Sequence, residues 1–167
     1  KARYGVFGVP GNHEYYSGYE EWMKFLPTLG IRMLHNEHVL TGGRCGGAGG
    51  GDGSCSRHHG EGGAGYTQGA GGSPGKGVRI LASHQPRLAP EAAAHGVDLQ
   101  VSGHTHGGMI AGIDRLVARF NEGFVSGLYT VGEMKLYVSN GAGIWNGFPI
   151  RIGVPSEIVL IRLRKEE

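Results

Sequence analysis

Side chains that can bind metal ions follow three short apolar segments of the chain. They are Asn12 and His13, then His84, then His104 and His106. Imidazole nitrogens and amide oxygens are ligands for divalent transition metals. Loops at strand ends are where binding and catalytic groups gather in α/β proteins. We therefore expect the ends of separate strands to bring Asn12, His84, His104 and His106 into one ion-binding cluster, with His13 beside it.

The spacing of His104 and His106 suggests that they serve two different ions. In extended backbone, residues two apart point to the same side and lie about 6.5 Å apart along the chain. Two such imidazoles, each about 2.0–2.1 Å from its ion, could bind ions separated by roughly 3.5–4 Å. Glycines on both sides of the pair allow the backbone to turn sharply.

The elements before the glycine-rich stretch must position Asn12 and His13. Residues 4–9 are predicted to form a buried strand that ends at Pro10-Gly11. Ser17 is expected to cap a helix that closes near residues 27–30, with Trp22 and its aromatic neighbours facing the core. Two strands, 31–35 and 38–40, are expected on either side of a turn, with His35 and His38 as hairpin residues.

The second half alternates predicted strands with a helix and then becomes rich in strands. A helix is expected over residues 88–95, with Gly96 as its stop. Predicted strands cover residues 78–82, 97–101, 127–131, 135–138 and 158–163. This order favours an α/β fold with a mixed sheet over an all-parallel one. Trp145 lies in a loop with several glycines, where it could either line a pocket or pack in the core.

A glycine-rich stretch, residues 42–77, interrupts this pattern. It holds 17 of the 34 glycines. Glycine loses the most backbone entropy on ordering and has no side chain to bury, so we expect a disordered insert without any packed element. We also consider a reading-frame error or a degenerate insertion as its origin. The two cysteines, Cys45 and Cys55, both lie here, and their spacing to His58 and His59 fits no common zinc pattern.

The composition gives no sign of a nucleic-acid or membrane partner. A formal net charge of +2 is too small to indicate binding to nucleic acid or to an anionic membrane. No apolar run reaches the roughly 20 residues that cross a bilayer. Because the chain opens directly into a strand pattern, we expect that it begins inside a domain.

The three polar segments, in this order, resemble the last three motifs of the calcineurin-like metallophosphoesterases. The similarity extends to residues 83–86, 104–108 and 121–123, and it is greatest to the bacterial branch that carries an N-terminal membrane anchor. This resemblance implies a mixed-sheet metallophosphoesterase sandwich with βαββα-type layers. Residues 1–167 would be the C-terminal portion of one such domain, with its N-terminal part missing and the glycine-rich stretch unmatched.

The resemblance also implies roles for individual residues and two divalent metal ions, which could be Mn, Fe, Zn or Co. Asn12, His84 and His104 would bind one ion, and His106 would bind the second. His13 would be catalytic, facing the phosphoester substrate and stabilising phosphoryl charge or protonating the leaving group. A metal-bound hydroxide would attack phosphorus in line.

Two family motifs, Asp-x-His and Gly-Asp-x-x-Asp, have no counterpart in this chain. Both should precede Gly11, but only ten residues do, and none of them is a carboxylate. We therefore expect the isolated chain to bind metal poorly and to lack turnover, with any membrane association through upstream sequence. A non-catalytic remnant that binds at most one ion is the alternative. A glycine-rich linker between two small modules would not explain the three polar segments.

Overall fold

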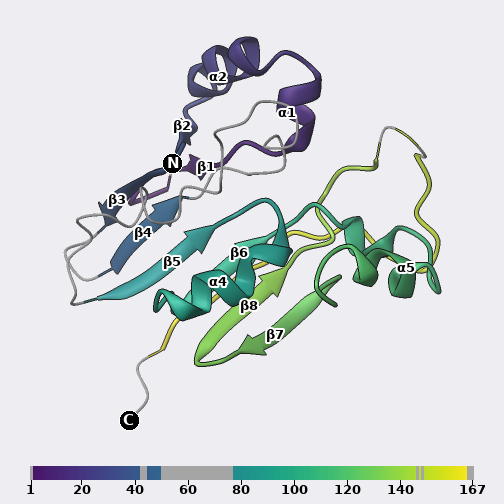
Figure 1. Ribbon diagram of the computed structural model, residues 1–167. Helices are drawn as coiled ribbons and strands as arrows, with labels where there is room; N and C mark the ends of the chain where they lie inside the picture. The colour runs from purple at the N-terminus through teal and green to yellow at the C-terminus, as the bar shows by residue number, and fades with distance from the viewer. Residues whose placement is uncertain (1, 42–44, 50–76, 146, 148, 165–167) are drawn as a thin grey trace.

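The fold is a mixed α/β arrangement with two sheets (Figure 1). The computed structural model describes residues 2–41, 45–49, 77–145, 147 and 149–164. A two-stranded parallel sheet contains β1 (Phe7–Gly8) and β2 (Arg32–Met33). A six-stranded sheet has the order β3-β4-β5-β6-β8-β7. Its strands are β3 (Glu37–Thr41), β4 (Cys45–Gly49), β5 (Val78–Ala82), β6 (Leu99–Ser102), β7 (Gly127–Val131) and β8 (Met134–Val138).

The larger sheet is parallel at its centre and antiparallel at its edges. Strands β4, β5, β6 and β8 run parallel to one another. Strand β3 pairs with β4, and β7 pairs with β8, in antiparallel fashion. The α/β class with a mixed sheet, predicted from the order of elements, is therefore confirmed. Parallel neighbours end at the same edge of a sheet, and this property brings the polar segments after β5, β6 and β8 together.

Helices cover the sheets and carry part of the site. Helices α1 (Asn12–Tyr16) and α2 (Tyr19–Thr28) lie with β1 and β2, α4 (Ala89–Ala94) lies against the larger sheet, and α5 (Asp114–Arg119) lies beyond its end (Figure 1). Two short 3₁₀ turns, η2 (Pro86–Leu88) and η3 (His106–Gly108), follow the polar segments after β5 and β6. The predicted helix before Gly96 is confirmed, and Gly96 ends it with φ +75°.

The apolar core lies between α4 and the larger sheet. It contains buried side chains from β5, α4, the segment before β6, and β8: Leu81, Ala89, Ala92, Val97, Met134, Leu136 and Val138. Each large apolar side chain contributes about 1.5–3 kcal/mol on full burial. This core packs β5 and β8 against α4, so the residues that follow these strands start from a packed base.

One strand forms where none was predicted. Strand β4 lies inside the glycine-rich stretch, paired to β3 on one side and β5 on the other. The expectation of no packed element there was wrong at this point, because a central strand is held by backbone hydrogen bonds on both sides and needs no large side chains. Residues 42–44 and 50–76 lie outside the described residues. The disorder predicted for the insert therefore stays a prediction. So does the expectation that Cys55, His58 and His59 form no zinc site.

The predicted hairpin around residue 36 was also wrong. Strand β2 pairs with β1, whereas β3 pairs with β4, so the two predicted partners belong to different sheets. Asn36, with φ +52°, redirects the chain between them. His35 instead lies 2.7 Å from the Tyr19 hydroxyl through its Nδ1. A local turn signal does not determine which strand a segment will pair with.

Three further local expectations need correction. Helix α2 begins after Gly18, and Ser17 instead ends α1. Trp22 is 38% exposed, so it does not belong to the core. Residues 158–163 form no strand, and Ile158 is 93% exposed. A β-rich pattern yields a strand only where a partner supplies the hydrogen bonds.

Candidate metal centre

Three of the predicted metal ligands meet at one point although they come from three separate elements. The Asn12 side-chain oxygen, Oδ1, lies 2.7 Å from His84 Nε2 and 3.2 Å from His104 Nδ1. The two imidazole nitrogens are themselves 3.2 Å apart. Asn12 opens α1, His84 follows β5, and His104 follows β6. The expected convergence is observed for these three side chains, but among the described residues His106 does not join His84 and His104 in a group that could hold an ion.

The two histidines are held at one edge by parallel pairing that continues past the strands. Ser83 donates its backbone N–H to the Val101 carbonyl at 3.0 Å, and Gly103 donates to the His84 carbonyl at 3.1 Å. Below them, Gln100 is fully buried and donates from Nε2 to Ser102 Oγ at 3.0 Å. These bonds hold the backbone of the two segments that carry His84 and His104.

Asn12 reaches the cluster from a short helix whose first turn is capped. The N–H of Gly11 donates to the Glu14 carboxylate at 2.7 Å, as in a capping box. A Cβ atom at Gly11 would lie 2.8 Å from the His84 ring. Only glycine therefore lets the α1 backbone approach this imidazole so closely.

The donor set fits a divalent cation. Two donors that are each about 2.1 Å from one ion lie roughly 3.0–3.4 Å apart in octahedral or tetrahedral geometry. Two of the three separations are 3.2 Å and the third is slightly shorter. Among the described residues, no group of three or more His, Cys, Asp or Glu side chains could hold an ion. This cluster differs because its third donor is an amide oxygen.

His84 is in the neutral form that a metal ligand requires. Burial, which disfavours the charged imidazolium, is the largest cause that lowers the pKa of His84 to about 4. The Glu14 carboxylate opposes this shift, whereas the nearby His13 and His106 add to it. The ring is thus neutral at pH 7, and one nitrogen keeps its lone pair.

His106 belongs to a tight turn and not to extended backbone. The φ angles of His104 and His106 are +70° and +51°, so the predicted extended spacing was wrong. The turn is tied down by Thr105, whose hydroxyl donates to the Val125 carbonyl at 2.6 Å. Gly107 follows at φ +64°, and a Cβ atom there would overlap the Asn140 Oδ1 atom. Left-handed backbone at non-glycine residues is uncommon and gathers at functional sites.

One ring nitrogen of His106 makes no hydrogen bond with the part of the chain that the structure describes. This nitrogen, Nδ1, is buried. Burial, then the Arg151 and His13 charges, lower the pKa of His106. A buried polar atom without a hydrogen-bond partner costs free energy, so it is expected to have a functional or structural reason.

Arg151 was not anticipated from the sequence, and it joins the His106 turn to the following loop. Its guanidinium donates to the carbonyls of His106 at 3.2 Å and Asn140 at 2.6 Å. It also donates to Gly141 at 3.4 Å and, through Nε, to Gly143 at 3.2 Å. The fork of guanidinium N–H groups suits several carbonyls at once. A lone arginine in an apolar segment carries no sequence signal for this role.

His13 and Trp145 lie near the cluster. The His13 charge acts on both His84 and His106, and its ring packs edge-on against Tyr16 at 6.0 Å. Trp145 lines a cavity of about 150 Å³ together with His104 and His106. Of its two predicted positions, the pocket wall is the one observed.

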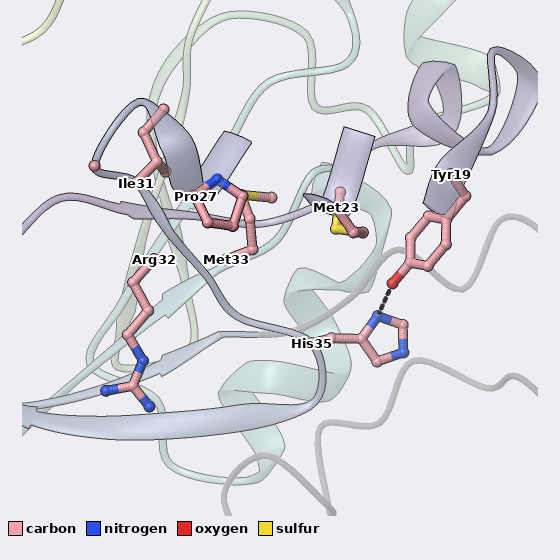
Figure 2. Close-up of a pocket in the computed structure, with 8 residues that line it drawn as sticks. Tyr19, Met23, Pro27, Ile31, Arg32, Met33 and His35 are labelled. Atoms are coloured by element: carbon pink, nitrogen blue, oxygen red, sulfur yellow. Dashed lines mark hydrogen bonds between the residues drawn. The ribbon is translucent and has the colours of Figure 1, made fainter. Parts of the chain in front are cut away.

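A larger groove lies elsewhere and is lined by none of the predicted ligands. It runs between α2 and β2, has a volume of about 680 Å³, and is lined mainly by apolar side chains such as Met23 and Met33 (Figure 2). The hydrogen-bonded Tyr19 and His35 close one end of it (Figure 2). Among the described residues, its lining lacks the convergent donors found after β5 and β6.

Comparison with known proteins points to one family. The chain is 38% identical to an uncharacterized metallophosphoesterase of Helicobacter pylori strain J99, over 98% of this chain and 44% of that protein. It is 39% identical to an uncharacterized metallophosphoesterase of Campylobacter jejuni, over 98% of this chain and 43% of the other. A transmembrane protein with metallophosphoesterase domain from Danio rerio is 34% identical, over 99% and 40% respectively.

The chain thus spans less than half the length of these three curated relatives. No protein-family model and no solved structure matches it. Within the described residues, every helix is too short or too polar to cross a membrane.

Proposed function

Because this chain belongs to the calcineurin-like metallophosphoesterase family, we propose that the protein hydrolyses phosphoester bonds with two divalent metal ions. One observation carries the proposal. Asn12 Oδ1, His84 Nε2 and His104 Nδ1 lie 2.7–3.2 Å from one another at the ends of different elements. Side chains far apart in sequence that present lone pairs to one point are the structural basis of a metal site.

Each residue has a distinct part in this proposal. Asn12, His84 and His104 hold the first ion. We assign the second ion to His106, whose buried Nδ1 has no hydrogen-bond partner among the described residues. Nitrogen and amide-oxygen donors accept Mn, Fe, Zn or Co. When bound, the ions would lower the pKa of a water molecule and withdraw charge from the phosphoryl oxygens.

His13 acts on the substrate and not on the ions. It follows Asn12 directly in α1, so one short helix carries both residues. Its charge lowers the pKa of both His84 and His106, which supports a position near them. From there it stabilises the phosphoryl oxygens or protonates the leaving alkoxide.

The ion at His106 needs carboxylate ligands that the cluster does not contain. In the described part of the chain, no acidic side chain joins two histidines in a group that could hold an ion. We place these ligands in the remainder of the longer protein indicated by the relatives' lengths. The 167-residue chain alone then binds one ion and has no turnover.

The test compares the full-length protein with the 167-residue chain. The substrates are p-nitrophenyl phosphate and bis-p-nitrophenyl phosphate, with Mn²⁺ present or removed by chelator. We expect Mn²⁺-dependent hydrolysis by the full-length protein only, and its loss in His104→Ala. The control His95→Ala removes a histidine at the end of α4 and should keep activity.

A non-catalytic protein that binds one ion is the second candidate. The same three converging donors support it, because they suffice for a single ion. Mn²⁺ binding by the full-length protein without hydrolysis of either ester would favour this candidate and contradict the enzyme.

A further inference from the structure

The cavity beside the two turn histidines is small, and part of its wall is apolar. Its volume is about 150 Å³, and its lining includes Met109, Val117 and Trp145 in addition to His104 and His106. The three apolar side chains are only partly exposed. Within the described part of the chain, no Lys, Arg, Asp or Glu lines this cavity, so its occupant need not carry a charge of its own.

Hydrogen bonds hold the segments that line the cavity. Met109 donates its N–H to the His106 carbonyl at 3.1 Å. Asn121, 5% exposed, donates from Nδ2 to the Val117 carbonyl at 3.0 Å and so closes the end of α5. Arg151 holds the loop before Trp145 through the Gly143 carbonyl. Pre-formed pockets bind ligands without a large cost of ordering.

We propose that this cavity receives the organic group of the phosphoester and selects small apolar or aromatic groups, an inference that rests on the proposed function. A cavity of about 150 Å³ is large enough to admit a benzene ring. The phosphoryl group would lie at the His104 and His106 end, and the organic group would extend along Val117 and Trp145. A phosphoester whose organic group is charged or strongly polar would lose its hydration here without gaining a charged partner.

Fluorescence of Trp145 provides a direct measurement of occupancy. The chain has two tryptophans, and Trp22→Phe leaves Trp145 as the sole indole. In Mn²⁺, this variant would be titrated with phenylphosphonate and with methylphosphonate, which are not hydrolysed. We expect phenylphosphonate to bind about tenfold more tightly or better, since a single methylene in an apolar pocket is worth about tenfold or more.

A matched pair of substitutions on α5 assigns the preference to the cavity. Val117→Asn, in the wall, should reduce the phenyl preference at least threefold and leave methylphosphonate affinity unchanged. Leu116→Asn changes the neighbouring side chain, which is 56% exposed and does not line the cavity, and should change neither affinity.

The outcomes distinguish a failure of the apolar subsite from a failure of the proposed function. Equal affinities for the two phosphonates, with Mn²⁺ bound, would overturn the apolar subsite and leave the proposed function intact. A phenyl preference that Val117→Asn does not reduce would also overturn it. A separate calorimetric titration of the Trp22→Phe variant with Mn²⁺ that shows no binding would remove the proposed ion site, and with it the proposed function and the inference together.

Discussion

The side-chain oxygen of Asn12 lies 2.7 Å from Nε2 of His84, although the two residues are 72 positions apart in the chain. The oxygen can only accept, so in the ion-free protein a ring N–H must donate to it. His104 Nδ1 competes for the same oxygen at 3.2 Å. The Asn12 oxygen and the two ring nitrogens therefore compete for few protons. A cation that accepted a lone pair from each of them would remove this competition.

Two replacements of Asn12 test whether its side-chain oxygen binds the proposed ion. Asn12→Ala removes a donor from the proposed ion and should weaken Mn²⁺ binding at least tenfold, by analogy with losses seen when even supporting residues of metal sites are changed. Asn12→Asp keeps an oxygen in place and adds charge, so it should retain binding. Calorimetric titration with Mn²⁺ measures both. Equal affinities for Asn12→Ala and the unaltered chain would contradict the role of Asn12.

Mn²⁺ should raise the thermal midpoint of the unaltered chain. A ligand that binds only the folded state stabilises it by about 2.7 kcal/mol at one hundred times its Kd. The midpoint shift should disappear in His84→Ala and persist in His13→Ala, since His13 is proposed to face the substrate. Differential scanning calorimetry with and without Mn²⁺ gives the comparison. A shift lost in His13→Ala as well would place that residue among the ligands.

Two glycines of the same loop should differ in their tolerance of alanine. Gly107 has φ +64°, and an added Cβ would overlap Asn140 Oδ1, so Gly107→Ala should cost about 1–3 kcal/mol or more of stability. A Cβ added at Gly103 would have no described atom within 4 Å, so Gly103→Ala is the control and should change little. Urea unfolding measures both. Similar losses in the two variants would show that the Asn140 contact is unimportant.

Arg151 should stabilise the loop around the His106 turn. It donates to backbone carbonyls of four residues, and hydrogen bonds to charged groups contribute about 1.5–3 kcal/mol each. Arg151→Met should therefore lower the unfolding free energy by about 2 kcal/mol or more. Arg162→Met removes the same charge at an exposed position that makes no such bonds with the described residues, and it should be near neutral.

A second measurement separates a local effect of Arg151 from a global one. Amide hydrogen exchange at residues 140–145 should accelerate more in Arg151→Met than exchange in β5 or β8. Uniform acceleration throughout the sheet would contradict a specific role in the loop.

Local sequence was sufficient for elements whose signals are local. The predicted bounds of β5 and β7 agree with the structure, and Gly96 ends α4 as expected. The placement of His84 and His104 after strands was also predictable, because apolar runs followed by polar or glycine residues mark strand ends. The amino-acid types that could hold an ion were evident in the same way.

Long-range pairing decided the rest. Only the parallel register of β5 and β6 places His84 beside His104, and only the approach of α1 adds Asn12. Strand β4 depends on its two neighbours, β3 and β5, which share backbone hydrogen bonds with it. The left-handed backbone conformation of His106 and the hydrogen bonds of Arg151 arise from contacts across the fold. Local periodicity does not encode such contacts. Residue types therefore specify the available chemistry, and the pairing of distant backbone segments determines where it is assembled.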